Sequence, residues 1–397
     1  MGTDELETQG RKMHIGIVGP CSNGSLADLL PPSGGGDLGS GGYSIVNRVR
    51  ALINRGHRVS VITLSPKIKK PTNFNGSKLS FFVYPKRIHK RMRDLYKLER
   101  QGLRQGICLA APDFLHADWT YEYALACLES RLPTIITIRD NAFQILRHQT
   151  DLYRLGRLFI QIWVLRKARF LTANSPYLAD SLHWLAKTGI DVVPNSIEVS
   201  DKGHGVVDTV SHPVRIATVL NGWGRRKNPQ AAIRGFALLR RRLPDAQMYM
   251  YGNDFEAGGV AARWAMNQGL QRNIHFCGLL SHPELQQALS HMSLLLHPAL
   301  EESFGMVLIE AMALGLPVVA GNTSGAVPWV LDNGRAGFLT DVRDSEQIAR
   351  TLLTCVEQVE DRRWRQRAAY QRVLTVFSAD AVAAQYETVY ERALSRH

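Results

Sequence analysis

Two glutamates eight residues apart carry the most specific chemistry in this sequence. Glu302 and Glu310 lie in the segment His-Pro-Ala-Leu-Glu-Glu-Ser-Phe-Gly-Met-Val-Leu-Ile-Glu (297–310), which follows an apolar run. On an α-helix, eight residues turn through about 800°, so the two side chains point about 80° apart. One carboxylate can accept hydrogen bonds from sugar hydroxyls while the other reaches a ribose. The same spacing also fits an acidic first turn that only complements the helix dipole.

Backbone amides beside these glutamates offer an anion site. We expect a helix over residues 304–314 with Ser303 as its cap, so that the amides of Ser303, Phe304 and Gly305 point at whatever lies before the helix. Such amides bind a phosphate or carboxylate.

A glycine-rich loop between Gly19 and Tyr43 is a second candidate for phosphate binding. Gly41 and Gly42 end this loop directly before a helix-like stretch. A diphosphate can approach their backbone closely because no Cβ stands in the way. The loop contains neither a Walker A pattern nor a clean G-x-G-x-x-G, and a mobile surface loop has the same composition.

Strand-like apolar runs alternate with helix-like segments in both halves of the chain, and these elements must position the candidate residues. The runs are 14–19, 59–64, 81–83, 114–116, 134–138, 170–173 and 192–193, then 215–220, 247–252, 274–278, 294–297 and 316–320. This alternation predicts two doubly wound α/β domains with parallel sheets, which bind ligands at the carboxyl ends of their strands.

Composition and charge narrow the function classes. The 397 residues are 45% hydrophobic and 21% charged, which is ordinary for a folded protein, and the net charge of +13 favours anionic partners. Five scattered cysteines without a C-x-x-C indicate neither a disulfide framework nor a zinc site. The first residues do not resemble a secretory signal, and no apolar run is long enough to span a bilayer. We therefore expect a cytoplasmic protein.

The segment around the two glutamates closely resembles the E-x7-E motif of the retaining glycosyltransferases of family 4, which have the GT-B fold. Further segments resemble the same family: Gly41-Gly42, residues 55–63, Val-Pro-Asn-Ser-Ile at 193–197 with Ser196 in place of glycine, and residues 324–330 and 334–339. The resemblance implies two Rossmann-like domains that face each other across a cleft. We expect a tail at 1–12, an acceptor-side domain at 13–198, a linker at 199–212, a nucleotide-sugar-binding domain at 213–378 and a helix at 379–397 that can cross back to the first domain.

The resemblance also implies roles for single residues on the donor side. Glu310 binds the ribose, Glu302 lies against the donor sugar, and Lys227 neutralises the departing diphosphate. The family usually has an arginine five residues before this lysine, where the chain has Gly222. Arg225 or Arg226 then replaces it from another direction, or the diphosphate site is less positive.

Three residues of the first half are candidates on the acceptor side. Phe-Leu-His-Ala-Asp-Trp-Thr (114–120) resembles the family's strand-end histidine segment, which makes His116 and Asp118 acceptor-side candidates and His116, with Glu302 and Lys227, a candidate catalytic residue. His116 also fits a buried core imidazole. Arg139 stands where relatives often have a histidine and could bind an anionic group of the donor or acceptor. Ser175 either lines the cleft or caps a helix.

Residues 86–104 form a basic stretch, with eight lysines or arginines against Asp94 and Glu99. Ile88, Met92, Leu95 and Tyr96 fall at helical spacing, which predicts an amphipathic basic helix. Such a helix can lie on anionic lipid at the inner face of the membrane, or it is a solvated helix face.

The resemblance implies a retaining hexosyltransferase that moves a sugar from a nucleotide-diphosphate donor, and we expect a UDP- or GDP-sugar as donor, a saccharide or lipid-linked acceptor, and a role in cell-surface polysaccharide assembly. No D-x-D motif occurs, so we expect neither a metal nor a cofactor. A non-hydrolysing sugar-nucleotide epimerase is the first alternative. A nucleic-acid-binding protein is suggested only by the charge, and we expect no nucleic-acid partner.

Overall fold

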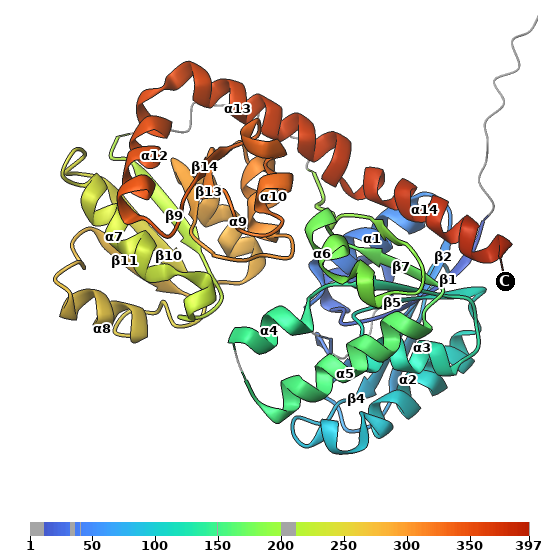
Figure 1. Cartoon of the computed structure of the whole chain (residues 1–397). Helices are drawn as coiled ribbons and strands as arrows, with labels where there is room; N and C mark the ends of the chain where they lie inside the picture. The colour runs from blue at the N-terminus through green and yellow to red at the C-terminus, as the bar shows by residue number, and fades with distance from the viewer. Residues whose placement is uncertain (1–11, 32–35, 40, 149, 200–211, 397) are drawn as a thin grey trace, which may run out of the picture.

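Two α/β domains lie side by side in the computed structural model, which describes residues 12–31, 36–39, 41–148, 150–199 and 212–396 (Figure 1). Most of the tail expected at 1–12 and of the linker expected at 199–212 therefore lies outside the described residues. Each domain has a sheet with helices on both faces, which confirms the predicted fold class.

The N-terminal sheet has eight strands in the order β3-β4-β2-β1-β5-β6-β7-β8, and all neighbouring pairs are parallel except β3 with β4. Its strands are β1 His14–Val18, β2 Arg58–Ser65, β3 Thr72–Asn75, β4 Leu79–Pro85, β5 Phe114–Asp118, β6 Thr134–Ile138, β7 Phe170–Ala173 and β8 Ile190–Val192. Its helices are α1 Tyr43–Asn54, α2 Lys97–Ala110, α3 Glu122–Glu129, α4 Ala142–His148, α5 Leu152–Lys167 and α6 Pro176–Leu182. Strand β3 was not predicted from the sequence.

The C-terminal sheet has six parallel strands in the order β11-β10-β9-β12-β13-β14. They are β9 Arg215–Val219, β10 Gln247–Tyr251, β11 Ile274–Gly278, β12 Leu294–His297, β13 Val318–Gly321 and β14 Phe338–Thr340. The helices are α7 Pro229–Leu239, α8 Val260–Asn267, α9 His282–Ser290, α10 Met306–Ala313, α11 Val327–Val330, α12 Ser345–Glu357 and α13 Val359–Arg372.

Helix α14 (Ala379–Ser395) follows the C-terminal domain in sequence but packs on the N-terminal domain (Figure 1). Its Tyr386 and Tyr390 are buried beside α1 and the N-terminal sheet. The two passages of the chain between the domains touch each other, because Ile197 forms backbone hydrogen bonds of 2.9 Å with both Phe377 and Ala379.

The basic stretch 86–104 does not form the single amphipathic helix expected from its sequence. A 3₁₀ turn over Arg91–Asp94 is separated from α2 by Leu95 and Tyr96, whose φ angles of 50° and 60° are left-handed and interrupt a helix. Several of its cations form ion pairs within the domain: Arg87 with Asp94 and Glu99, Arg91 with Glu122, and Arg100 with Glu129.

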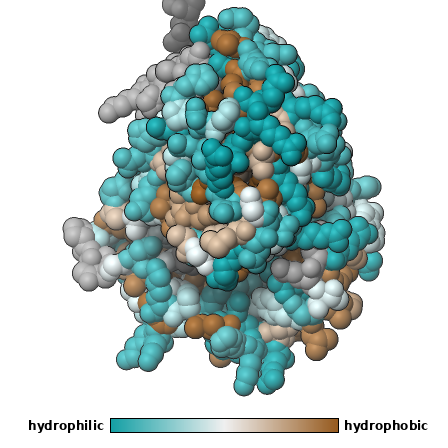
Figure 2. All heavy atoms as spheres, turned by 90° about the vertical axis from the view of Figure 1, so that its left-hand side faces the viewer, coloured by the Kyte–Doolittle hydropathy of each residue, from teal (hydrophilic) through white to brown (hydrophobic). Residues whose placement is uncertain are grey.

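Viewed from the side of the C-terminal domain, the surface is mostly hydrophilic and its hydrophobic side chains gather in small separate patches (Figure 2). No helix in the described part of the chain is long and apolar enough to cross a membrane.

Candidate active site between the two domains

A pocket of about 620 Å³ lies between the domains, at the carboxyl ends of strands from both sheets. Segments that follow β1, β5 and β6 contribute Gly42, Asp118 and Arg139 from the N-terminal side. Segments around β9 and β12 contribute Lys227, His297, Glu302, Ser303, Phe304, Gly305 and Glu310. The volume suits a substrate of nucleotide size.

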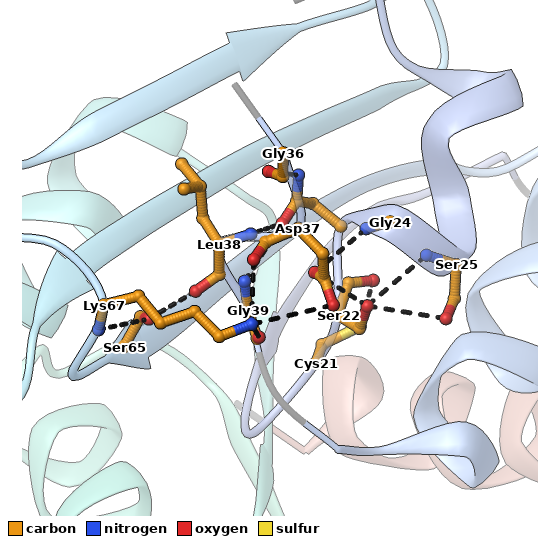
Figure 3. Close-up of polar contacts among 11 residues, drawn as sticks. Cys21, Ser22, Gly24, Ser25, Gly36, Asp37, Leu38, Gly39, Ser65 and Lys67 are labelled. Atoms are coloured by element: carbon orange, nitrogen blue, oxygen red, sulfur yellow. Dashed lines mark hydrogen bonds and ion pairs between the residues drawn. The ribbon is translucent and has the colours of Figure 1, made fainter. Parts of the chain in front are cut away.

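Side chains within the glycine-rich loop hold its backbone in place (Figure 3). Ser22 donates to the Asp37 carboxylate over 2.9 Å, and Lys67 donates to the carbonyls of Asp37 and Gly39 over 2.8 and 3.1 Å. Asn23 accepts hydrogen bonds from the amides of Leu38 and Gly39. These contacts join residues 22–23 to residues 37–39 of the loop and to Lys67, which follows β2.

The conformation of Gly42 requires glycine. Its φ is 84°, and a Cβ there would lie 2.0 Å from the carbonyl oxygen of Pro20. Gly42 begins α1 and lines the pocket, whereas Gly41 is exposed and is not among the pocket residues. Of the two glycines that the sequence offered as phosphate-binding candidates, only Gly42 therefore lies at the pocket.

Helix α10 begins two residues later than expected, and Ser303 is not its cap. Gly305 occupies the cap position with a φ of 90°, a conformation that ends the preceding loop. The Ser303 carbonyl instead accepts a 2.6 Å hydrogen bond from Ser175 of the other domain. Ser175 also caps α6 by accepting from the amide of Leu178, so the helix-cap alternative describes its position, and Ser175 is not among the pocket residues.

Glu302 forms a buried ion pair with Lys227 on the C-terminal wall of the pocket. His297 Nε2 lies 3.3 Å from the same carboxylate oxygen. Burial raises the pKa of Glu302, but the nearby His297 ring and the Lys227 charge outweigh this effect and hold the pKa below its usual value. Glu302 is therefore ionised at neutral pH.

Glu310 lies in the second turn of α10 and faces the same pocket. Its carboxylate is 3.3 Å from His282 Nε2. The His282 ring stacks on Tyr43 of the N-terminal domain with 4.1 Å between ring centres. Glu310 thus lies where the two domains touch.

Neither arginine expected to complete the diphosphate clamp lines the pocket. Arg225 is exposed, and Arg226 forms a 3.1 Å ion pair with Glu301. Lys227 and Arg139 are the two lysine or arginine side chains among the described residues that line it.

The acceptor-side candidates divide into two groups. Asp118 and Arg139 line the pocket and contact each other, whereas His116 is fully buried outside it. The ring nitrogens of His116 lie 2.8 Å from the Tyr390 hydroxyl and 2.6 Å from Thr137 Oγ1. Burial holds its pKa well below the usual value. The placement matches the core imidazole and not a group that meets substrate.

The pocket residues that were not recognised in the sequence include the polar side chains His297, Asn174 and Asn195. His297 ends β12 and Asn174 follows β7, so their places at the carboxyl ends of parallel strands were the available signal. No group of three or more His, Cys, Asp or Glu side chains suited to a metal ion occurs in the described ranges.

Each half of the chain matches the model of a known protein family. Residues 41–201 match the family model "Glycosyltransferase Family 4" and residues 213–372 match "Glycosyl transferases group 1". The chain belongs to the family 4-type GT-B glycosyltransferases. This confirms the resemblance seen in the sequence and a sugar-transferring function.

Individual members of this glycosyltransferase family resemble the chain over most of its length. N-acetyl-alpha-D-glucosaminyl L-malate synthase of Bacillus anthracis is 24% identical, over 70% of this chain and 74% of that protein. Glycogen synthase of Mycobacterium tuberculosis is 27% identical over 70% and 68%.

Solved structures share the fold at low sequence identity. Sucrose-phosphate synthase from Thermosynechococcus elongatus superposes with a TM-score of 0.75 at 18% identity, covering 98% of this chain and 100% of that one. Anabaena HepE in complex with UDP-glucose gives a TM-score of 0.68 at 18% identity, covering 96% and 100%.

Proposed function

We propose that this glycosyltransferase takes its sugar from a nucleoside diphosphate donor, UDP- or GDP-linked, and transfers it to a saccharide or lipid-linked acceptor with retention of configuration. Cell-surface polysaccharide assembly is the proposed setting. The observation that carries the donor assignment is the shared wall of Lys227, Glu302 and Glu310 in one interdomain pocket. The UDP-glucose complex of Anabaena HepE supports the choice of UDP.

The pocket suits stabilisation of a leaving diphosphate. As the bond between the sugar C1 and the diphosphate oxygen breaks, negative charge grows on the diphosphate. Lys227, the amide of Gly42 and the amides of residues 303–305 then stabilise it from both domains. Glu310 binds the ribose and Glu302 the donor sugar.

Retention proceeds in this proposal by attack on the face that the diphosphate leaves. The acceptor oxygen bonds to C1, and its proton passes to the departing diphosphate. No carboxylate is assigned as a nucleophile for a covalent intermediate. Capture of a glycosyl-enzyme adduct would contradict this route.

A thermal-shift screen of UDP-, GDP-, ADP- and dTDP-sugars tests the donor. A ligand at 100 times its Kd stabilises the fold by about 2.7 kcal/mol, which shifts Tm measurably. We expect a UDP- or GDP-sugar to give the largest shift and Glu310→Ala to reduce it. Analysis of the product then separates transfer from epimerisation, since an epimerase changes the sugar without an acceptor.

Turnover should not depend on a divalent metal, because lysine and backbone amides neutralise the diphosphate in this proposal. We expect activity in EDTA to equal activity in buffer. Activity that EDTA abolishes and Mg²⁺ or Mn²⁺ restores would contradict it.

We also propose that residues 86–104 contact an anionic membrane surface. Within this segment Ile88 and Leu95 are 71% and 53% exposed, and Lys90 and Arg93 are exposed beside them. Apolar and cationic side chains on one surface favour anionic lipid.

A further inference from the structure

The N-terminal wall of the pocket contains two arginines and one carboxylate. Asp118 accepts hydrogen bonds from Arg139 through one oxygen and from Arg48 through the other. Burial raises the pKa of Asp118, but the two guanidinium charges outweigh this effect and keep it low, so Asp118 is ionised. The cluster therefore has a net charge of +1.

No neighbouring group removes this charge. His116, which interacts with Asp118, is neutral because burial holds its pKa well below the usual value. Asp140, the next residue after Arg139, pairs with Arg157 and accepts hydrogen bonds from Trp119 and Tyr121. Arg139 thus remains a net positive charge at the pocket.

Arg139 also has hydrogen-bond donors to spare. Its contacts among the described residues use three of the five N–H groups of a guanidinium, two with Asp118 and one with Asn195. These contacts fix the plane of the group. Arg48 is fully buried behind Asp118, so Arg139 is the member of the cluster that lines the pocket.

Arg139 lies to one side of the place proposed for the diphosphate. Its strand β6 is two strands from β1, whose following loop contains Gly42. Two strand spacings are about 10 Å. On the opposite wall Lys227 is paired with Glu302, so Arg139 is the described cation of the pocket whose charge its own partners leave unbalanced.

We propose that Arg139 binds an oxyanion, a carboxylate or phosphate, carried by a sugar substrate beside the diphosphate. This inference rests on the proposed function, because it adds a recognition site to the same pocket. The oxyanion belongs either to the donor sugar or to the acceptor. A fixed guanidinium with two free N–H groups suits bidentate binding of either oxyanion.

Calorimetric titration of the full chain distinguishes the two sources. The donor experiment compares UDP-glucuronic acid with UDP-glucose, and the acceptor experiment compares glucose 6-phosphate with glucose at saturating UDP. We expect the charged ligand to bind at least tenfold more tightly than the neutral one in one of the two. Arg139→Gln should abolish this preference while leaving the affinity for UDP unchanged, and Arg139→Lys should restore it only in part.

Arg350→Gln is the matched control, because Arg350 is an exposed arginine that pairs with Glu346 on the surface. It should keep the wild-type preference.

Equal affinities for charged and neutral ligands on the wild-type chain, a comparison that needs no variant, would overturn the inference. An equal loss of UDP, UDP-glucose and UDP-glucuronic acid binding in Arg139→Gln would place the arginine on the diphosphate and would also overturn it. Failure of the wild-type chain to bind UDP and GDP would instead contradict the proposed donor, and glucose 6-phosphate titrated without nucleotide would still test Arg139.

Discussion

Glu302 remains charged although it is buried, because Lys227 and His297 both contact the same carboxylate. Such a pair is stable only while it is complete, since removal of one partner leaves a buried charge without compensation. In the proposed function, a diphosphate that attracts Lys227 would leave Glu302 free to accept hydrogen bonds from sugar hydroxyls. The sequence motif identified both glutamates, but it could not show that His297 supports the first.

Breaking this pair should affect stability and activity differently. We expect Lys227→Met to lower the free energy of unfolding by about 3 kcal/mol, because it leaves Glu302 unpaired. The double variant Lys227→Met with Glu302→Gln should recover most of that loss but remain inactive, with kcat about 10²- to 10³-fold below wild type. Urea unfolding and a turnover assay measure the two effects. A double variant as unstable as the single one would refute the pairing.

His116 should make the protein sensitive to mild acid. Its pKa in the folded chain is well below 6.5, so below pH 6.5 the unfolded chain binds a proton that the folded chain does not. Stability from this residue is therefore complete above pH 6.5 and is lost as the pH falls. We expect the difference in unfolding free energy between wild type and His116→Gln to shrink between pH 7 and 5. A constant difference would contradict the lowered pKa, because it would show that His116 binds its proton equally well in the folded and unfolded chains.

Elements with continuous apolar runs could be predicted, and short polar elements could not. Strands β1, β2 and β12 are buried on both faces and have the aliphatic sequences expected of parallel strands. Strand β3, with the sequence Thr-Asn-Phe-Asn, is a four-residue edge strand whose pairing with β4 depends on tertiary contact. The single helix predicted for residues 86–104 was also wrong because of tertiary contact. Tyr96 is fully buried against the domain in a left-handed conformation, which interrupts the helix.

The proposed membrane contact of residues 86–104 can be tested with two of its exposed cations, Lys90 and Arg93. Lys90→Glu with Arg93→Glu should weaken flotation with anionic liposomes, since each cation near the surface contributes about 1 kcal/mol. Lys69→Glu with Lys70→Glu makes the same charge change at exposed positions elsewhere in the domain and should have little effect. Flotation that both double variants retain equally would remove this segment from membrane binding.

At the scale of the whole molecule, the last helix belongs to the core of the first domain. Helix α14 places Val382, Tyr386 and Tyr390 in the same hydrophobic cluster as β1 and α1. Tyr390 also lies 2.8 Å from the His116 ring, a contact 274 residues away in sequence. The sequence indicated a terminal helix that can cross back to the first domain, but its amphipathic face alone fits either domain and did not decide between them.

Tyr390 should therefore stabilise the N-terminal domain from the far end of the chain. We expect Tyr390→Phe to cost about 1 kcal/mol, the value of one buried hydrogen bond, and Tyr390→Ala about 3–5 kcal/mol from the lost ring. Denaturant unfolding followed by a probe in each domain separates the effects. Tyr390→Ala that destabilises only the C-terminal domain would contradict this packing.

The bridge between Ile197 and the segment from Phe377 to Ala379 has a mechanical consequence. The chain crosses between the domains twice at one place, where Ile197 is hydrogen-bonded to Phe377 and Ala379. We expect a change in the angle between the domains to pivot near this bridge, so that the two walls of the pocket separate with little sliding. Cutting the chain at the first crossing would leave the second crossing and the packing of α14 to hold the two domains together.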